Sequence, residues 1–156
     1  MTPYSSKRDN IIFLAARMIR SFEGCKLAAY WDAGGKCWTI GFGHTKDVTC
    51  SQLINLAQAE LFLSEDAAPI VTLVEHLPIV AAAALVSFGY NCGISAAQRV
   101  LDGGLKVTPD GFMTAKGERF GVLSGGSYVI GLDARRKLEA ALYLTATAGN
   151  GYGYPS

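Results

Sequence analysis

The sequence predicts one domain that is mainly helical and carries one short β-structured segment. The chain has 156 residues, a length that favours a single domain with room for two lobes and a cleft. Half of the residues are hydrophobic, which is enough for a sizeable core. Aromatic and β-branched residues gather in residues 27–45 around a Gly-Gly pair, whereas apolar residues elsewhere recur at helical spacing.

The first helix is predicted to begin at Asp9 or Asn10, because either side chain can cap a helix N-terminus. It should end at Gly24, which suits the left-handed conformation common after a helix. Its apolar face consists of Ile12, Ala15, Ile19 and Phe22. Glu23 then lies at the negative end of this helix. The helix field and burial in a cleft both oppose ionisation of its carboxyl, as a proton donor requires.

Residues 27–45 predict a β-hairpin or small sheet that turns at residues 33–36, where the two glycines lie. Gly41 and Gly43 follow on the second strand. Glycines within a strand pattern indicate that another backbone or a ligand approaches closely there.

Helices are predicted over residues 51–64 and 67–76, and Pro78 can open a third helix that runs through residues 81–90. Gly93 should end this third helix. Because it is almost entirely apolar, we expect it to be the buried core helix.

Residues 103–131 are rich in glycine, and we expect short helices and loops there. A last helix is predicted over residues 133–146, and its apolar face consists of Leu138, Ala141, Leu142 and Thr145. Residues 150–156 resemble a frayed tail.

The net charge of +1 gives no strong overall attraction to nucleic acid or membrane, so neither is expected as a partner. Basic residues do cluster near both ends of the chain: Lys7, Arg8, Arg17, Arg20 and Lys26, then Arg135, Arg136 and Lys137. These clusters are predicted to be solvated helix faces; attraction to an anionic polymer such as a cell wall is the alternative.

The four cysteines, Cys25, Cys37, Cys50 and Cys92, lack the CxxC spacing of zinc and redox sites. Three disulfide connectivities are open to them, but we expect free thiols because the sequence shows no secretion signal. A thiol near the site, at Cys25 or Cys37, is either incidental or a means of redox control. The chain has no P-loop, HExxH or complete GxGxxG sequence, so no metal or cofactor is expected.

One set of residues has a pattern that indicates a catalytic site. Glu23 and Asp32 lie nine residues apart, and the segment from Thr39 to Thr45 (Thr-Ile-Gly-Phe-Gly-His-Thr) follows closely. In glycoside hydrolysis one carboxylic acid protonates the leaving oxygen while a carboxylate positions the attacking water. A glutamate and an aspartate at this separation are common by chance, but the ordered set within 23 residues is far less so.

These residues resemble the phage-type lysozymes, the endolysins of glycoside hydrolase family 24. The similarity spans about residues 10–147 and rests on Phe22–Gly24, Ala29–Asp32, Thr39–Thr45, Ala84–Gly93 and Gly131–Tyr143. The resemblance implies an α+β, lysozyme-like fold of one catalytic domain over residues 1–156. It implies a small β-containing lobe at about residues 24–65, a helical lobe at about 66–147 that the N-terminal helix joins, and a cleft between them.

The resemblance also implies an activity: hydrolysis of the β-1,4 bond between N-acetylmuramic acid and N-acetylglucosamine in peptidoglycan, with inversion. Glu23 matches the family's proton donor. Asp32 matches the carboxylate that helps to position the water, and Thr39 matches the threonine that holds this water on the opposite face of the sugar. Six residues separate Asp32 from Thr39, one more than in the shortest family members, so the placement of Thr39 is open.

Arg135 matches an arginine that pairs with the catalytic glutamate; the alternative is a surface arginine. His44 matches a histidine that pairs with an acidic residue of the next helical segment, here Glu65 or Asp66, and we interpret the pair as a structural brace between lobes.

Tyr90 and Asn91 match positions where the central helix borders the cleft, so both are predicted to bind substrate. The alternative for Tyr90 is that its ring packs in the hydrophobic core instead of lining the cleft. Trp31 and Trp38 could offer platforms for sugars, but we expect them to pack the small lobe.

The leading hypothesis is therefore an endolysin that acts on peptidoglycan as a monomer. The polar residues 1–10 and the short apolar stretch 11–16 form neither a signal peptide nor an anchor, so we expect synthesis in the host cytoplasm and release to the wall through a holin. Three alternatives stay open: a lytic transglycosylase, a catalytically silent wall-binding or scaffold module, and a prophage-derived enzyme kept by its host.

Overall fold

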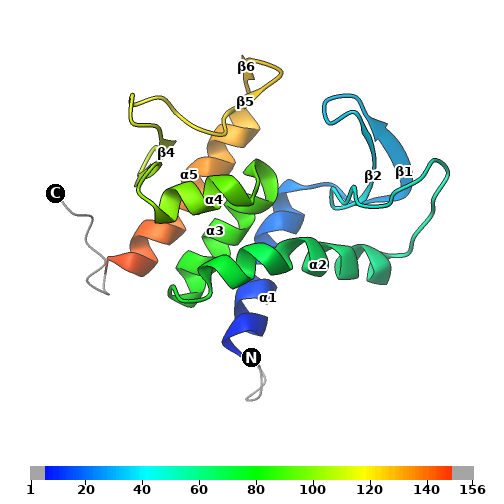
Figure 1. Ribbon diagram of the computed structural model, residues 1–156, viewed down its shortest axis with the longest axis horizontal. Helices are drawn as coiled ribbons and strands as arrows, with labels where there is room; N and C mark the ends of the chain where they lie inside the picture. Colours follow the sequence, from blue (N-terminus) through cyan, green and yellow to red (C-terminus); the bar gives the residue numbers. More distant parts are fainter. Residues whose placement is uncertain (1–5, 149–156) are drawn as a thin grey trace.

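The computed structural model describes residues 6–148, in which five helices and three two-stranded antiparallel sheets follow the chain. The predicted frayed tail at residues 150–156 lies outside this range. The mixture of helices and small sheets confirms the α+β class. In Figure 1 the hairpin of β1 (Lys26–Asp32) and β2 (Cys37–Gly41) stands to the right of the helices. Strand β4 (Gly111–Met113) stands to the left, and β5 (Leu123–Ser124) and β6 (Ser127–Tyr128) stand above the helices.

Helix α1 (Lys7–Phe22) begins earlier than predicted, because Ser6 rather than Asp9 or Asn10 is the N-cap. The Ser6 hydroxyl accepts the backbone N–H of Asp9, while the Asp9 carboxylate accepts the backbone N–H of Ser6, so Asp9 is the third residue of a capping box. Glu23 is the C-cap, one residue before the predicted Gly24.

The predicted hairpin is confirmed as β1 (Lys26–Asp32) and β2 (Cys37–Gly41), with the glycine pair in the turn. Lys36 has a positive φ of 53°, so the last turn position is left-handed. A small cluster of buried residues fixes β2 and the following loop to the helices: Ala16, Ile19, Phe42, Ala59 and Leu63.

The two helices predicted over residues 51–64 and 67–76 form one helix, α2 (Leu56–Val74), so that prediction was wrong. A second capping box delays its start, since Asn55 is the N-cap and Gln58 is its partner. The residues between the two predicted helices, Glu65 and Asp66, carry no helix breaker, and Pro69 is accommodated within α2. Helix α2 also crosses the predicted lobe boundary at residue 65, and the division into lobes stays a prediction.

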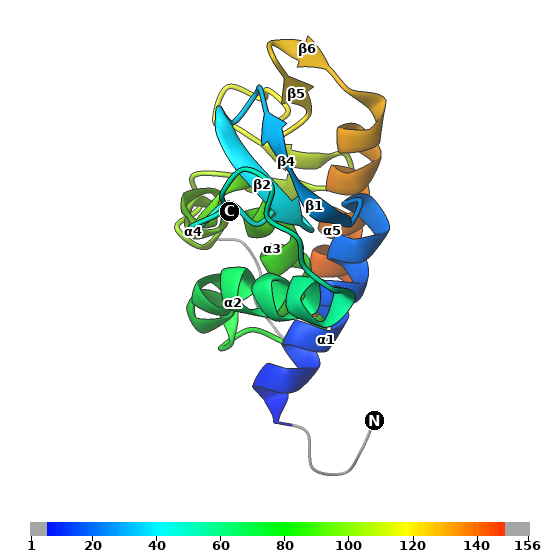
Figure 2. The same ribbon diagram turned by 90° about the vertical axis from the view of Figure 1, so that its right-hand side faces the viewer.

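The core helix is confirmed as α3 (Ile79–Cys92), which is capped by Gly93 and has nine consecutive buried residues from Ala81 to Gly89. Pro78 is its N-cap rather than a first-turn residue. Helices α1, α2 and α5 (Ile130–Thr147) all pack on α3. So does α4 (Ile94–Leu101), a helix that was not predicted from the sequence. In Figures 1 and 2 α3 accordingly lies at the centre of the helical part.

The short helices expected in the glycine-rich segment were wrong. Residues 103–131 instead form two small hairpins, β3 (Lys106–Thr108) with β4 (Gly111–Met113) and β5 (Leu123–Ser124) with β6 (Ser127–Tyr128), and only the start of α5 is helical. Six glycines in this segment have positive φ, which favours tight turns between strands: Gly103, Gly111, Gly117, Gly121, Gly125 and Gly126.

Helix α5 (Ile130–Thr147) confirms the last predicted helix but turns the other face inward. Leu138 of the predicted apolar face is 45% exposed. The residues buried instead include four charged ones: Asp133, Arg135, Arg136 and Glu139. The expectation of a solvated basic face at residues 135–137 was therefore wrong for the two arginines, because buried carboxylates pair with them.

Candidate active site

The end of helix α1 carries the predicted proton donor. The backbone N–H of Glu23 donates to the carbonyl of Ile19 (2.7 Å), which closes the last helical turn and leaves the side chain half-buried. Both views place this end of α1 between the foot of the β1–β2 hairpin and α5 (Figures 1 and 2).

Arg135 of α5 reaches Glu23 across 112 residues of sequence. Its Nη1 donates to Glu23 Oε1 at 2.5 Å, and its guanidinium lies 4.9 Å from the centre of the Phe22 ring. The arginine side chain is only 3% exposed, whereas that of Glu23 is 27% exposed. The pair therefore places an open carboxylate against an enclosed cation, and the surface alternative for Arg135 was wrong.

The hairpin register brings the two other predicted catalytic residues to one face. Tyr30 pairs with Thr39, and Asp32 pairs with Cys37. Residues two apart on a strand, and residues opposite each other on paired strands, share a face of the sheet. Asp32 and Thr39 therefore project from the same side, and the Thr39 hydroxyl lies 3.8 Å from the Cys37 thiol.

The glycine turn determines where the Asp32 carboxylate lies. The backbone N–H of Gly34 donates to Asp32 Oδ1 (3.0 Å). A Cβ atom at Gly35 would approach Asp32 Oδ2 to 2.8 Å, closer than real Cβ contacts. The Gly34-Gly35 turn thus packs directly against both oxygens of the Asp32 carboxylate.

The phenol of Tyr30 links the two carboxylates electrostatically. Burial raises the pKa of Tyr30, and Asp32 and then Glu23 raise it further. Burial likewise raises the pKa of Tyr90 well above its usual range, with smaller contributions from Asp66 and Glu23, which Arg135 opposes. The two carboxylates predicted to do the chemistry therefore both act on the phenol of Tyr30.

A pocket of about 310 Å³ opens beside Glu23, and Asn91 is part of its wall. It is lined by Ser21, Phe22, Glu23, Asn91, Val129, Gly131, Leu132 and Arg135. A predicted substrate-binding residue and the predicted proton donor thus share one pocket.

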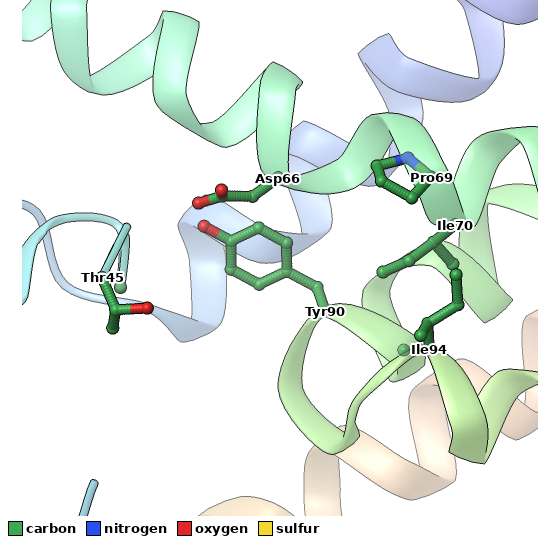
Figure 3. Close-up of a pocket in the computed structure, with 8 residues that line it drawn as sticks. Thr45, Asp66, Pro69, Ile70, Tyr90 and Ile94 are labelled. Carbon is green, nitrogen blue, oxygen red and sulfur yellow. The ribbon is translucent and has the colours of Figure 1, made fainter. Parts of the chain in front are cut away.

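Tyr90 lines a second pocket of about 310 Å³, together with Thr45, Asp66, Pro69 and Ile70 (Figure 3). Its hydroxyl points toward Asp66 and donates to the carbonyl of Phe42 (3.0 Å). Its ring packs against the large core around α3 and against the small cluster behind the hairpin. Tyr90 thus borders a pocket and also joins two packed regions.

The partner of His44 is Asp66, not Glu65. His44 Nδ1 lies 2.8 Å from Asp66 Oδ2, and the imidazole stacks on Phe62 at 4.1 Å between ring centres. Glu65 is exposed because the helical step to the next residue turns it away from the hairpin loop. The contact joins the loop that follows β2 to helix α2, as a structural brace would.

The sequence analysis missed the polar groups behind Arg135. Ser87 on the apolar helix α3 and Glu139 on α5 are both fully buried and both contact Arg135. A charged residue on an amphipathic helix is usually solvated. The available signal was the spacing of Glu139 four residues after Arg135 and three after Arg136 on one helix face.

The remaining predicted features are distributed as follows. Trp31, 54% exposed, and Trp38 contact each other edge to face at 5.7 Å on the side of the hairpin opposite Asp32. All four cysteines are free thiols, as expected. Within residues 6–148 no group of His, Cys, Asp or Glu side chains is arranged to hold a metal ion. Across those same residues no helix is both long and apolar enough to cross a membrane.

Comparison with known proteins identifies the family. The family model described as phage lysozyme matches residues 20–139, which include every predicted site residue. The endolysin of Bacillus phage B103 is 34% identical over 154 residues, covering 90% of this chain and 56% of that protein. This chain spans just over half the length of the curated endolysins that it matches.

Two solved structures share the fold. The muramidase domain of SpmX from Asticaccaulis excentricus has a TM-score of 0.61 at 25% identity, covering 83% of this chain and 94% of that domain. The active form of P1 phage endolysin Lyz has a TM-score of 0.63 at 18% identity, covering 96% and 98%. The family match covers well over half of the sequence, and we conclude that this chain belongs to the phage lysozyme family.

Proposed function

We propose that this protein is a muramidase that hydrolyses the β-1,4 bond between N-acetylmuramic acid and N-acetylglucosamine in peptidoglycan. The observation that carries the proposal is the arrangement around Glu23. An accessible carboxyl group lies in a pocket against a buried cation, and Asp32 and Thr39 lie on one face of the hairpin that follows Glu23 in the chain.

In the proposed mechanism Glu23 protonates the oxygen of the departing sugar. Proton transfer leaves a carboxylate, and the guanidinium of Arg135 at 2.5 Å stabilises the negative charge as it develops. Arg135 thus acts on the product of the proton transfer as well as on the orientation of the acid.

The water that completes hydrolysis is proposed to lie over the hairpin face, held by the Asp32 carboxylate and the Thr39 hydroxyl. A carboxylate accepts one proton of the water and a hydroxyl can accept the other, which turns a lone pair toward the sugar carbon. Attack from this side, opposite the leaving oxygen, inverts the configuration of that carbon.

Asn91 lies in the pocket of Glu23, where its amide can hydrogen-bond to an acetamido group of the substrate. Tyr90 lines the second pocket, where its ring offers a face for sugar contact. We further propose that the protein is released from the cytoplasm to the wall through a holin and that it acts as a monomer.

The testing experiment compares the wild-type protein with Glu23→Gln on purified peptidoglycan and on cells stripped of their outer membrane. The amide keeps the shape of the side chain but cannot deliver a proton, so clearing should fall by about 10²–10⁴-fold. Circular dichroism should show an unchanged fold. Clearing by Glu23→Gln at the wild-type rate would refute the assignment of the acid. Released sugars in the 1,6-anhydro form would identify a lytic transglycosylase instead.

A further inference from the structure

A group of four buried polar residues lies directly behind the proposed acid. Ser87, Arg136 and Glu139 have no exposed surface, and Arg135 is 2% exposed. Two are arginines and one is a glutamate, and burial of such charges is costly unless they are paired. Because Arg135 also contacts the carboxyl group of Glu23 at the edge of this group, the group and the acid form one connected unit.

The carboxylate of Glu139 is the centre of the group. The Ser87 hydroxyl donates to its Oε1 (2.6 Å), and Arg135 Nε donates to the same oxygen (3.0 Å). Arg136 Nε lies 2.9 Å from its other oxygen, Oε2. Donors from two helices, α3 and α5, therefore hold this carboxylate in one orientation.

The guanidinium of Arg135 is held by separate contacts on its separate nitrogens. Nε faces Glu139, and Nη2 donates to the backbone carbonyl of Ser87 (3.0 Å). Nη1 remains, and it is the nitrogen that meets Glu23. Because the guanidinium is planar and rigid, fixing two nitrogens determines the direction of the third.

We infer that Glu139 is a positioning residue of the active site: its buried carboxylate, anchored by Ser87 and Arg136, aims Arg135 at Glu23 and shares its positive charge. The inference rests on the proposed function, because it assigns a role toward the acid. It makes the charged inner face of α5 part of the catalytic machinery.

If Glu139 has this role, proton release by Glu23 depends on the charge of Glu139, although the two side chains are not in contact. The groups that interact electrostatically with Glu23 are Arg135 from α5, Tyr30 from the hairpin and Tyr90 from α3. Those facing Glu139 are Arg135 and Arg136 on its own helix, with Ser87 and Cys92 from α3. Arg135 is common to both sets, so a change at Glu139 should reach Glu23 mainly through it.

The first variant is Glu139→Gln, which keeps an acceptor for Arg135 but removes the charge. Arg135 then has one anionic partner rather than two, so Glu23 should give up its proton at lower pH. The alkaline limit of muramidase activity should move down by on the order of one pH unit, with KM little changed. A ¹³C NMR titration of the Glu23 carboxyl should show the same shift without reference to activity.

The second variant, Ser87→Ala, should shift the alkaline limit of activity and the Glu23 titration in the opposite direction. Without the hydroxyl donor the Glu139 carboxylate is less satisfied and attracts Arg135 more strongly, so the alkaline limit and the carboxyl titration should move up. This variant changes no charge. It decides the matter if Glu139→Gln fails to fold, a risk because removing one partner of a buried ion pair is destabilising.

An Arg135→Met background tests whether the effect passes through the arginine. There, Glu139→Gln should shift the Glu23 titration by less than half of its effect in the wild type. An equal shift in both backgrounds, or no shift from either variant in folded protein, would overturn the inference. A wild-type protein without muramidase activity would refute the proposed function, and the NMR titration would still decide the role of Glu139.

Discussion

Tyrosine 90 provides a prediction whose sign reverses with pH. At neutral pH its hydroxyl donates to the carbonyl of Phe42, and this bond connects α3 to the loop that follows β2. Tyr90→Phe removes this half-buried hydrogen bond, which contributes about 1 kcal/mol to stability. In a chain of this size that loss should lower the melting temperature by roughly 2–4 °C.

Above pH 10 the same hydroxyl group lowers the stability of the folded protein. Burial is the largest cause that raises the pKa of Tyr90, so the folded protein retains a proton that the unfolded chain releases near pH 10. The stability from this group is complete below that pH and is lost as pH rises toward the folded-state pKa. The loss is about 1.4 kcal/mol for each pH unit in that window.

The stability curves of the wild type and Tyr90→Phe should therefore cross within about one pH unit above pH 10, where a 1.4 kcal/mol loss exceeds a 1 kcal/mol gain. Urea unfolding, followed by far-ultraviolet circular dichroism between pH 7 and pH 11.5, measures both curves. Groups such as Tyr30 titrate equally in both proteins and cancel in the difference. A stability difference that stays constant with pH would refute the argument.

Three further substitutions test the packing and the site. Phe88→Ala should cost about 3–5 kcal/mol in urea unfolding, because Phe88 is fully buried and stacks on Phe112 at 3.8 Å; a cost below 1 kcal/mol would contradict this packing. Gly121→Ala should cost about 1–3 kcal/mol, since its φ is +74° and a Cβ would lie 2.9 Å from the Cys92 thiol; unchanged thermal stability would argue against it. Thr39→Ala should lower kcat with little effect on KM, whereas Thr39→Ser should retain most turnover; equal kcat in both variants would exclude a role for the hydroxyl.

The sequence predicted those elements whose signals are local. The hairpin carried aromatic and β-branched residues in its strands and a Gly-Gly pair in its turn, and α3 was apolar enough to be assigned to the core. The predicted starts of α1 and α2 were wrong because more than one residue near each start can cap a helix. Ser6 and Asn55 each form a capping box that starts a helix away from the predicted residue, and periodicity alone does not rank such choices.

The candidate site was predicted less completely, and the reason is tertiary pairing. Hydrophobic periodicity assigned Leu138 to the buried face of α5, but the charged side chains of that helix are buried because partners from α1 and α3 reach them. No local pattern reveals that Ser87 will meet Glu139 from a helix 52 residues away. For the same reason sequence left open whether Glu65 or Asp66 would face His44.

The most direct test of the central claim is the configuration of the sugar released first. Proton NMR during cleavage of a soluble peptidoglycan fragment can record the anomer formed at the cleaved N-acetylmuramic acid before it equilibrates. A water held by Asp32 and Thr39 opposite Glu23 predicts the α anomer as the first product. The β anomer as the first product, or an anhydro sugar, would contradict the account.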